Sequence, residues 1–307
     1  MRIGLFLNNV PPRPLADLIA AARAAEAQGI HTLWLGQLYD HDALTLATIL
    51  AAATDRLELG TWVVPTFPRH PTVMAQQALS AQAASGNRLV LGVGLGHEAV
   101  MTRRLGLPFE KPIRHMREYL EVLQPLLAQT RVEYVGAEQR IRLQLTLPGV
   151  TAPPVLLGAL GPQMLRLAGR LADGVAIWLG GARYLRDFAL PRLLEVAAAA
   201  NRPDPRIAVG LPVAVCDDPE IGREAIAKLV DPSAALPSYR AVLERGGAER
   251  PSDVALIGPE SLVAEQLAEL ADLGVSDFNA IVVPVPGETG SRERTLSLLA
   301  SRARARG

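Results

Sequence analysis

The chain has 307 residues, 49% of them hydrophobic, a length that suits either one α/β barrel or two ordinary domains with a sizeable core. Lysine plus arginine and aspartate plus glutamate number 31 each, and this balance argues against a protein whose main partner is nucleic acid or an anionic membrane. The single cysteine, Cys216, excludes a disulfide framework, and the absence of both a membrane-length apolar run and a signal-peptide cleavage region predicts a cytoplasmic protein.

Apolar segments that suit β-strands alternate with longer helical patterns from one end of the chain to the other. Eight strands are predicted, over residues 2–8, 31–36, 57–65, 88–94, 153–160, 175–180, 206–216 and 278–284. These segments are continuously apolar rather than alternating, as is typical of parallel strands covered on both faces. Several of the intervening helices end at a glycine, namely Gly29, Gly86 and Gly274, where a left-handed C-terminal cap is favoured.

Eight strand–helix units in strict alternation predict one (β/α)8 TIM barrel that occupies residues 1–307 as a single domain. A doubly wound open sheet is the alternative, but it would more naturally carry a glycine loop after its first strand, where this chain reads LNNVPPRP. Two segments break the alternation. Residues 132–150 predict a short hairpin that turns near Gly136, and residues 231–261 predict an irregular insertion of short helices and loops near strand seven.

The ends of the predicted strands are rich in glycine. Active sites of barrels lie at the carboxyl ends of the strands. Here those ends carry Asn8 and Asn9, Gly36 and Gln37, Thr61 to Thr66, Gly94, Gly96 and His97, Gly158 to Pro162, and Trp178 with Gly180. The stretch GVGLGH does not match the dinucleotide-binding motif, because His97 stands where the third glycine is needed. A glycine-rich rim instead lets a flat ring approach the backbone, which favours a planar cofactor over the barrel mouth.

Two further stretches each allow two interpretations. GALGPQ, residues 158–163, opens a helix with Pro162 near its first position, so it is either a site for a phosphate or a plain tight turn. YDHD, residues 39–42, has side chains that can ligate a metal, but capping of the helix that follows is the favoured interpretation. We therefore predict no metal site.

Four long stretches together resemble one protein family. They cover residues 57–100, 114–127, 159–181 and 210–218, and they are similar to the bacterial luciferase-like superfamily of flavin-dependent enzymes. Within it, the branch that uses the deazaflavin coenzyme F-420 is the most similar. The resemblance runs over nearly the whole chain, and the stretch from residue 57 to residue 100 is its most specific part.

The resemblance implies where a cofactor would lie. Its ring would rest at the carboxyl mouth of the barrel on a bulge at Thr61, Trp62 and Val63, where relatives hold a non-prolyl cis peptide bond. The remaining cofactor-binding positions that it implies are Gly36 and Gln37, Gly94 and Gly96, and, at the phosphate end, Gly158, Ala159, Leu160, Gly161 and Pro162. Four basic residues are expected near the rim, where they would attract the anionic oligoglutamate tail of F-420: Arg69, His70, Arg103 and Arg104.

The same resemblance implies an oxidoreductase that transfers a hydride between C5 of coenzyme F-420 and an unidentified small organic substrate. Two alternatives stay open: an FMN-dependent luciferase-like monooxygenase, and a barrel that binds a flavin-like molecule without catalysis. Sugar-phosphate dehydrogenases of the family carry an Asp-His pair after strand two and a glutamate after the strand-four glycines. This chain has Gly36, Gln37 and His97 at those positions, which argues against a sugar phosphate as substrate.

His97 is the candidate catalytic residue. It follows the glycines of strand four, and a histidine can donate or accept the proton that accompanies hydride transfer at cellular pH. The alternative is that His97 only caps the next helix or binds the edge of the cofactor ring. A homodimer is a further possibility, because the apolar helix predicted over residues 192–201 suits either an interface or ordinary packing on the barrel.

Overall fold

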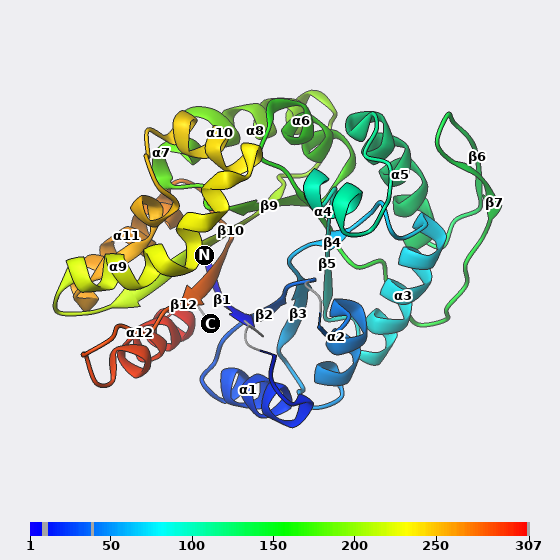
Figure 1. Ribbon diagram of the computed structural model, residues 1–307. Helices are drawn as coiled ribbons and strands as arrows, with labels where there is room; N and C mark the ends of the chain where they lie inside the picture. The colour runs from blue at the N-terminus through cyan, green and yellow to red at the C-terminus, as the bar shows by residue number, and fades with distance from the viewer. Residues whose placement is uncertain (8–11, 38–39, 306–307) are drawn as a thin grey trace.

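The computed structural model of the chain describes residues 1–7, 12–37 and 40–305, and within these ranges eight parallel strands close into a barrel (Figure 1). Around the barrel the strands follow the order β1 (Arg2–Leu7), β2 (Thr32–Leu35), β3 (Glu58–Thr61), β5 (Leu89–Gly94), β8 (Val155–Gly158), β9 (Gly174–Trp178), β10 (Arg206–Val215) and β12 (Asp277–Val282). The barrel closes because β12 pairs with β1, with Asp277 opposite Arg2. The predicted (β/α)8 barrel is confirmed.

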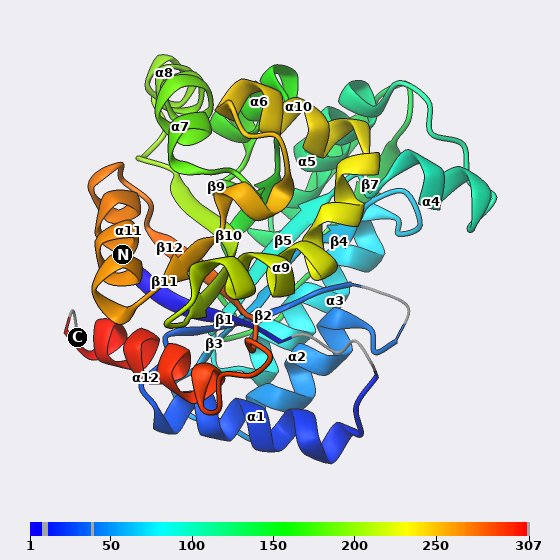
Figure 2. The same ribbon diagram turned by 60° about the vertical axis from the view of Figure 1, so that its left-hand side comes forward.

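Helices surround the barrel on its outside (Figures 1 and 2). They include α1 (Leu15–Ala27), α2 (Ala43–Ala51), α3 (Pro71–Ala84), α5 (Pro112–Leu127), α6 (Pro162–Leu171), α8 (Leu190–Ala199), α9 (Pro219–Val230), α11 (Glu260–Asp272) and α12 (Ser291–Arg304). Gly29, Gly86 and Gly274 have φ angles of 82°, 60° and 92°, which confirms the left-handed helix ends. Among the described residues, no helix is long and apolar enough to cross a membrane.

The two predicted insertions are present. The hairpin consists of β6 (Val132–Val135) and β7 (Arg140–Leu143), an antiparallel pair that lies at the outer edge of the molecule (Figure 1). The second insertion contains a 3-10 helix (Asp231–Ala235), α10 (Pro237–Gly246), another 3-10 helix (Pro251–Val254) and the short strand β11 (Leu256–Gly258). The sequence did not predict β11, which extends the sheet by pairing with the end of β10.

A cluster of charged side chains closes the N-terminal end of the barrel interior. Arg206 donates hydrogen bonds to Asp277 at 2.5 and 2.8 Å and to Glu58 at 2.6 Å, and Arg2 also bonds both carboxylates. Burial alone would raise the pKa of Asp277, but its hydrogen bonds and ion pair with Arg206 outweigh burial and hold that pKa below its usual value. The carboxylate of Asp277 is therefore ionised and paired inside the barrel.

Trp34 fills the layer above these charges. It is fully buried and packs with Val90, Leu156 and neighbouring small residues. A Cβ at Gly60 would lie 2.2 Å from the Trp34 ring, so only glycine fits opposite it on β3. Trp34 and its neighbours therefore fill the interior beside the charged cluster, and the cavity described below lies near the carboxyl ends of the strands.

Candidate active site at the barrel mouth

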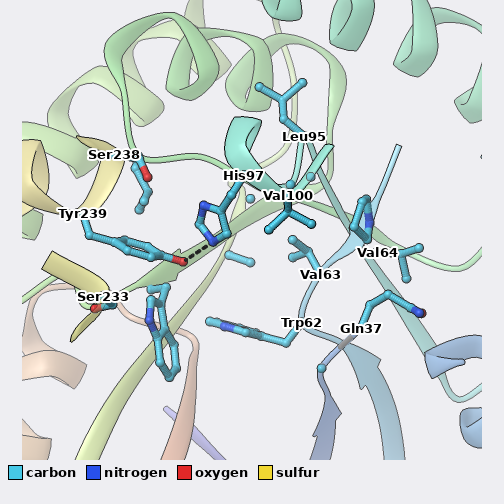
Figure 3. Close-up of a pocket in the computed structure, with 18 of the residues that line it drawn as sticks. Gln37, Trp62, Val63, Val64, Leu95, His97, Val100, Ser233, Ser238 and Tyr239 are labelled. Atoms are coloured by element: carbon cyan, nitrogen blue, oxygen red, sulfur yellow. Dashed lines mark hydrogen bonds between the residues drawn. The ribbon is translucent and has the colours of Figure 1, made fainter. Parts of the chain in front are cut away.

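A bulge interrupts the third strand at the mouth. Gly60 pairs with Val90, but after Trp62 and Val63 the short strand β4 (Val64–Pro65) pairs Val64 with Val93, one residue out of step. The Trp62–Val63 peptide bond is cis, as the family resemblance implied. The β3 strand and its continuation thus turn a tryptophan and a valine toward the centre of the mouth (Figure 3).

Thr61 and Gly92 hold the bulge in place. The Thr61 hydroxyl donates to the carbonyl oxygen of Gly92 and accepts from its amide, each at 2.8 Å. A Cβ at Gly92 would lie 2.0 Å from the Thr61 carbonyl oxygen, so this approach requires glycine. A Cβ at Gly94 or Gly158 would meet the Val63 side chain at 2.6 and 3.2 Å. The glycines at the ends of β5 and β8 therefore leave the space that the bulge occupies.

Above the bulge lies a cavity of about 780 Å³ at the carboxyl ends of the strands (Figure 3). Its floor is aromatic and apolar, with Phe6, Trp62, Trp178 and Ile281 among its lining residues. Trp62 packs edge-on against Trp34 with ring centroids 5.1 Å apart, so the floor rests on the solid layer below. An apolar, aromatic floor of this kind suits a planar ring system.

Most of the predicted site residues meet at this cavity. Those that line it are Gly36, Gln37, Trp62, Val63, Gly94, Gly96, His97, Gly158, Leu160 and Gly161. Three predicted cofactor-binding residues do not line it, and for them the placement differs from expectation. Thr61 and Ala159 are buried, with exposed fractions of 0% and 1%, and Pro162 is the first residue of α6. Asn8 and Asn9 lie outside the described residues.

The GALGPQ stretch is both a turn and a helix start. Gly161 is the N-cap residue of α6, and no side chain caps that end. The first amides of an α-helix have no partner within the helix, and they suit an anion. The YDHD stretch is also settled in part: Asp42 accepts from the Thr45 amide at 2.9 Å and caps α2, while Tyr39 lies outside the described residues.

Sequence reasoning missed one wall and much of the roof. The wall comes from Leu95 and from α4 (Glu98–Arg103), whose Val100 and Met101 line the cavity. The roof comes from α9 and the second insertion, and its members are Leu229, Val230, Ser233, Ser238 and Tyr239. Alternation along the strands could have identified floor residues such as Phe6 and Ile281, because alternate residues of a barrel strand face inward.

His97 and Tyr239 meet across the mouth. His97 is the N-cap residue of α4 without a side-chain capping bond, and its Nε2 lies 3.4 Å from the Tyr239 hydroxyl. The two rings pack edge to face, with centroids 5.3 Å apart. Burial lowers the pKa of His97 and raises the pKa of Tyr239 to about 12. Both side chains are therefore uncharged at neutral pH.

Arg69 is the one charged side chain among the described residues that line the cavity. Its Nη2 forms an ion pair with Asp42, and its backbone oxygen accepts from the Tyr119 hydroxyl at 2.8 Å. Its Nη1 is buried and has no hydrogen-bond partner among the described residues. The two N–H groups of Nη1 thus have no acceptor among the described residues. The other predicted rim residues are not among those that line the cavity: His70 accepts from the Thr72 amide at the start of α3, and Arg103 and Arg104 are exposed at the end of α4.

The comparisons with known proteins agree with this geometry. The luciferase-like monooxygenase family matches residues 1–277. The chain is 30% identical over 194 residues to the 5,10-methylenetetrahydromethanopterin reductase of Methanolobus tindarius, an alignment that covers 63% of this chain and only 58% of the reductase. Among solved structures, the coenzyme F-420 dependent tetrahydromethanopterin reductase of Methanopyrus kandleri superposes with a TM-score of 0.80 at 22% identity, over 99% of both chains.

A structural neighbour with the other cofactor is also similar. The oxygenating constituent of 3,6-diketocamphane monooxygenase from Pseudomonas putida, in complex with FMN, superposes with a TM-score of 0.78 at 16% identity, over 99% of this chain and 97% of that one. At such low identity the two structures establish the shared barrel fold, and they do not choose between the cofactors.

Proposed function

This chain belongs to the luciferase-like monooxygenase family, and we propose that it is an oxidoreductase that transfers a hydride between coenzyme F-420 and a small organic substrate. The observation that carries the proposal is the cavity at the barrel mouth, where the Trp62–Val63 bulge and an aromatic floor face the polar pair of His97 and Tyr239. The 32% identity over 197 residues to a putative coenzyme F420-dependent oxidoreductase of Mycobacterium tuberculosis supports the choice of F-420 over FMN.

The residues present fit such a cofactor. The apolar floor suits its planar ring, and the buried, unpartnered Nη1 of Arg69 offers a donor at the cavity wall. The start of α6 at Gly161 and Pro162 suits its phosphate group. When bound, F-420 supplies a ring carbon that gives or accepts a hydride. The protein's own part is to orient the ring, exclude water and supply or remove a proton.

The lining also favours an uncharged substrate. Its wall and roof are largely apolar, with Val100, Met101, Leu229 and Val230 among them. The one lining cation that the structure describes, Arg69, is already paired with Asp42. A charged group on the substrate would therefore find no ion-pair partner among the described lining residues. Burying an unpaired charge costs free energy. A ketone, an aldehyde or the corresponding alcohol meets these conditions.

Anaerobic turnover tests the proposed function. Reduced F-420 is mixed with the protein and with cyclohexanone, acetophenone or cinnamaldehyde, and oxidation of the deazaflavin is followed by absorbance. We expect enzyme-dependent oxidation without oxygen for at least one of these compounds. Oxygen consumption that depends on reduced FMN, with no reaction of F-420, would instead identify the chain as an FMN-dependent monooxygenase. Binding of F-420 without turnover of any substrate would favour a carrier.

Arg103, which is exposed at the end of α4, is predicted to attract the anionic tail of F-420. Arg103→Glu should weaken F-420 binding several-fold at low salt, because exposed charges act over about 8 Å at physiological ionic strength. The difference from wild type should shrink as salt rises. Fluorescence titration at several salt concentrations measures it, and Arg302→Glu is the matched control, because that exposed residue lies near the C-terminus of α12. Equal losses in the two variants would contradict a role for the rim.

We also propose a cytoplasmic homodimer. Support comes from the sequence, with its single cysteine, and from α8, where Leu194 is 41% exposed. The buried face of α8 packs on α6, and a Cβ at Gly169 would lie 2.8 Å from the Leu193 carbonyl oxygen. Only the outer face of α8 is thus left for a partner. Sedimentation analysis of wild type and of Leu194→Glu tests this, and an unchanged dimer in the variant would exclude α8 from the interface.

A further inference from the structure

Tyr239 reaches the mouth from an element that barrel periodicity does not predict. It lies in the first turn of α10, where its amide donates to the Leu236 carbonyl oxygen at 3.1 Å. Its ring packs against a buried apolar cluster that includes Val230 and Ile281, and Trp178 packs against the same cluster. The phenol is therefore fixed by its own helix and by the cavity floor, and its hydroxyl is directed at His97 (Figure 3).

His97 has one hydrogen-bonded nitrogen and one available nitrogen. Its Nε2 pairs with the Tyr239 hydroxyl at 3.4 Å, whereas Nδ1 has no hydrogen-bond partner among the residues that the structure describes. Nδ1 is not fully buried, so a ligand can reach it. Burial is the sole cause of the lowered pKa of His97, and no charged group contributes to it. A neutral imidazole carries its proton on one nitrogen only, and its partner decides which one.

We propose that Tyr239 is a positioning residue that donates its hydroxyl proton to Nε2 of His97, holds the imidazole proton on Nδ1, and completes a proton relay from solvent to the substrate oxygen. The proposal rests on the proposed function, because it assigns the proton path of the same site. The distance of 3.4 Å is long for such a bond, but catalytic hydrogen bonds often tighten only when the substrate is bound.

The relay balances in both directions. In ketone reduction the carbonyl carbon gains the hydride that reduced F-420 would supply, and the carbonyl π electrons move to the oxygen, which takes the proton from Nδ1 of His97. Nε2 then takes the hydroxyl proton of Tyr239, and Tyr239, which is only partly buried, regains a proton from solvent. The imidazole is then left with its proton on Nε2; once the alcohol has left, water protonates Nδ1, and Nε2 returns its proton through Tyr239 to solvent, which restores the resting tautomer. Alcohol oxidation runs these steps in reverse, so it begins from the tautomer that carries the proton on Nε2, with Nδ1 free to accept the hydroxyl proton of the alcohol. Neither ring carries a lasting charge, in keeping with a site whose burial disfavours both the imidazolium and the phenolate.

Nuclear magnetic resonance of the protein without cofactor tests the positioning role. In protein labelled with ¹⁵N-histidine at neutral pH, the nitrogen shifts and two-bond couplings of His97 report which nitrogen carries the proton. We expect the Nδ1-protonated tautomer in wild type and a mixture of both tautomers in Tyr239→Phe. His97→Ala assigns the signal. The same tautomer distribution in wild type and Tyr239→Phe would overturn the proposal, and this result does not depend on F-420.

Kinetics provide the second test, with cyclohexanone and reduced F-420. We expect Tyr239→Phe to slow single-turnover hydride transfer by about tenfold or more while F-420 affinity changes little, and we expect no further loss when Tyr239→Phe is added to His97→Ala. Arg240→Gln, an exposed neighbour on α10, is the matched control for disturbance of the helix. Additive losses in the double variant would overturn the relay. If F-420 neither binds nor reacts, the proposed function fails and the tautomer measurement still decides the role of Tyr239.

Discussion

His97→Ala should lower the rate of single-turnover hydride transfer by about 10²–10⁴-fold and leave F-420 affinity within a few-fold of wild type. The reason is the position of the imidazole, which lines the cavity beside the glycines of β5 and presents an Nδ1 that has no hydrogen-bond partner within the part of the chain that the structure describes. His97 is a rim residue rather than part of the aromatic floor, so its loss removes a proton carrier and little of the surface that binds the ring. Stopped-flow measurement of deazaflavin absorbance checks this.

The rate of the same reaction, run as alcohol oxidation, should fall at low pH. Burial lowers the pKa of His97 below its ordinary value of about 6.5, so the ring is neutral at pH 7 and can accept a proton. Oxidation of cyclohexanol should therefore be constant near neutral pH and should decline as the pH falls through this lowered pKa. His97→Ala should lose that decline. If the rate with a true substrate is the same in wild type and variant at every pH, His97 only binds, and the proton comes from water.

Asp277→Asn should reduce the free energy of unfolding by about 3–5 kcal/mol, because it leaves Arg206 inside the barrel with one carboxylate in place of two. The Asp277 side chain is 3% exposed, and both of its oxygens accept from Arg206. Asparagine keeps the volume but removes the charge and one acceptor. Urea unfolding followed by circular dichroism measures the change.

The acid sensitivity of stability follows from the same group. Because the pKa of Asp277 is lower in the folded protein than in the unfolded chain, its contribution is fully present above the unfolded pKa of about 3.9 and is lost as pH falls through the folded pKa. The gap between wild type and Asp277→Asn should therefore close in strong acid.

Glu260→Gln is the matched control for Asp277→Asn. Its hydrogen bonds with Arg294 lower the pKa of Glu260 to about 2, yet its side chain is 46% exposed and solvent screens the pair. We expect little change in stability for this variant. Losses of similar size in both variants would show that the buried cluster contributes no more to stability than the exposed pair does.

The barrel could be predicted because its signal is local. Continuously apolar strands alternate with helices, and each strand end is marked by glycine or by a turn. The short strand β11 was missed, because three residues within a proline- and glycine-rich segment carry no periodicity. The helix α4 was missed for a similar reason, since its six residues directly follow the last glycine loop of β5.

The candidate site could be predicted only on its strand side. The backbone topology of a barrel places the strand ends, and with them Gly94, His97 and Gly158, at the mouth, independently of how the side chains pack. Thr61 was expected to touch the cofactor, but its hydroxyl bonds Gly92 and its side chain faces the neighbouring strand. Tyr239 lies 142 residues from His97, and no pattern in the sequence shows that α10 folds back over the mouth. Contacts between a strand end and an inserted helix require the three-dimensional structure.

A competition titration tests the central claim that this mouth is built for F-420. Purified protein is titrated with oxidised F-420, quenching of the deazaflavin fluorescence is followed, and FMN is then added in excess. We predict saturable quenching by the protein, weaker binding at higher salt, and little displacement by FMN, because the cofactor's ring and its anionic tail are both bound. Equal affinity for the two cofactors, or tighter binding of FMN, would contradict the account.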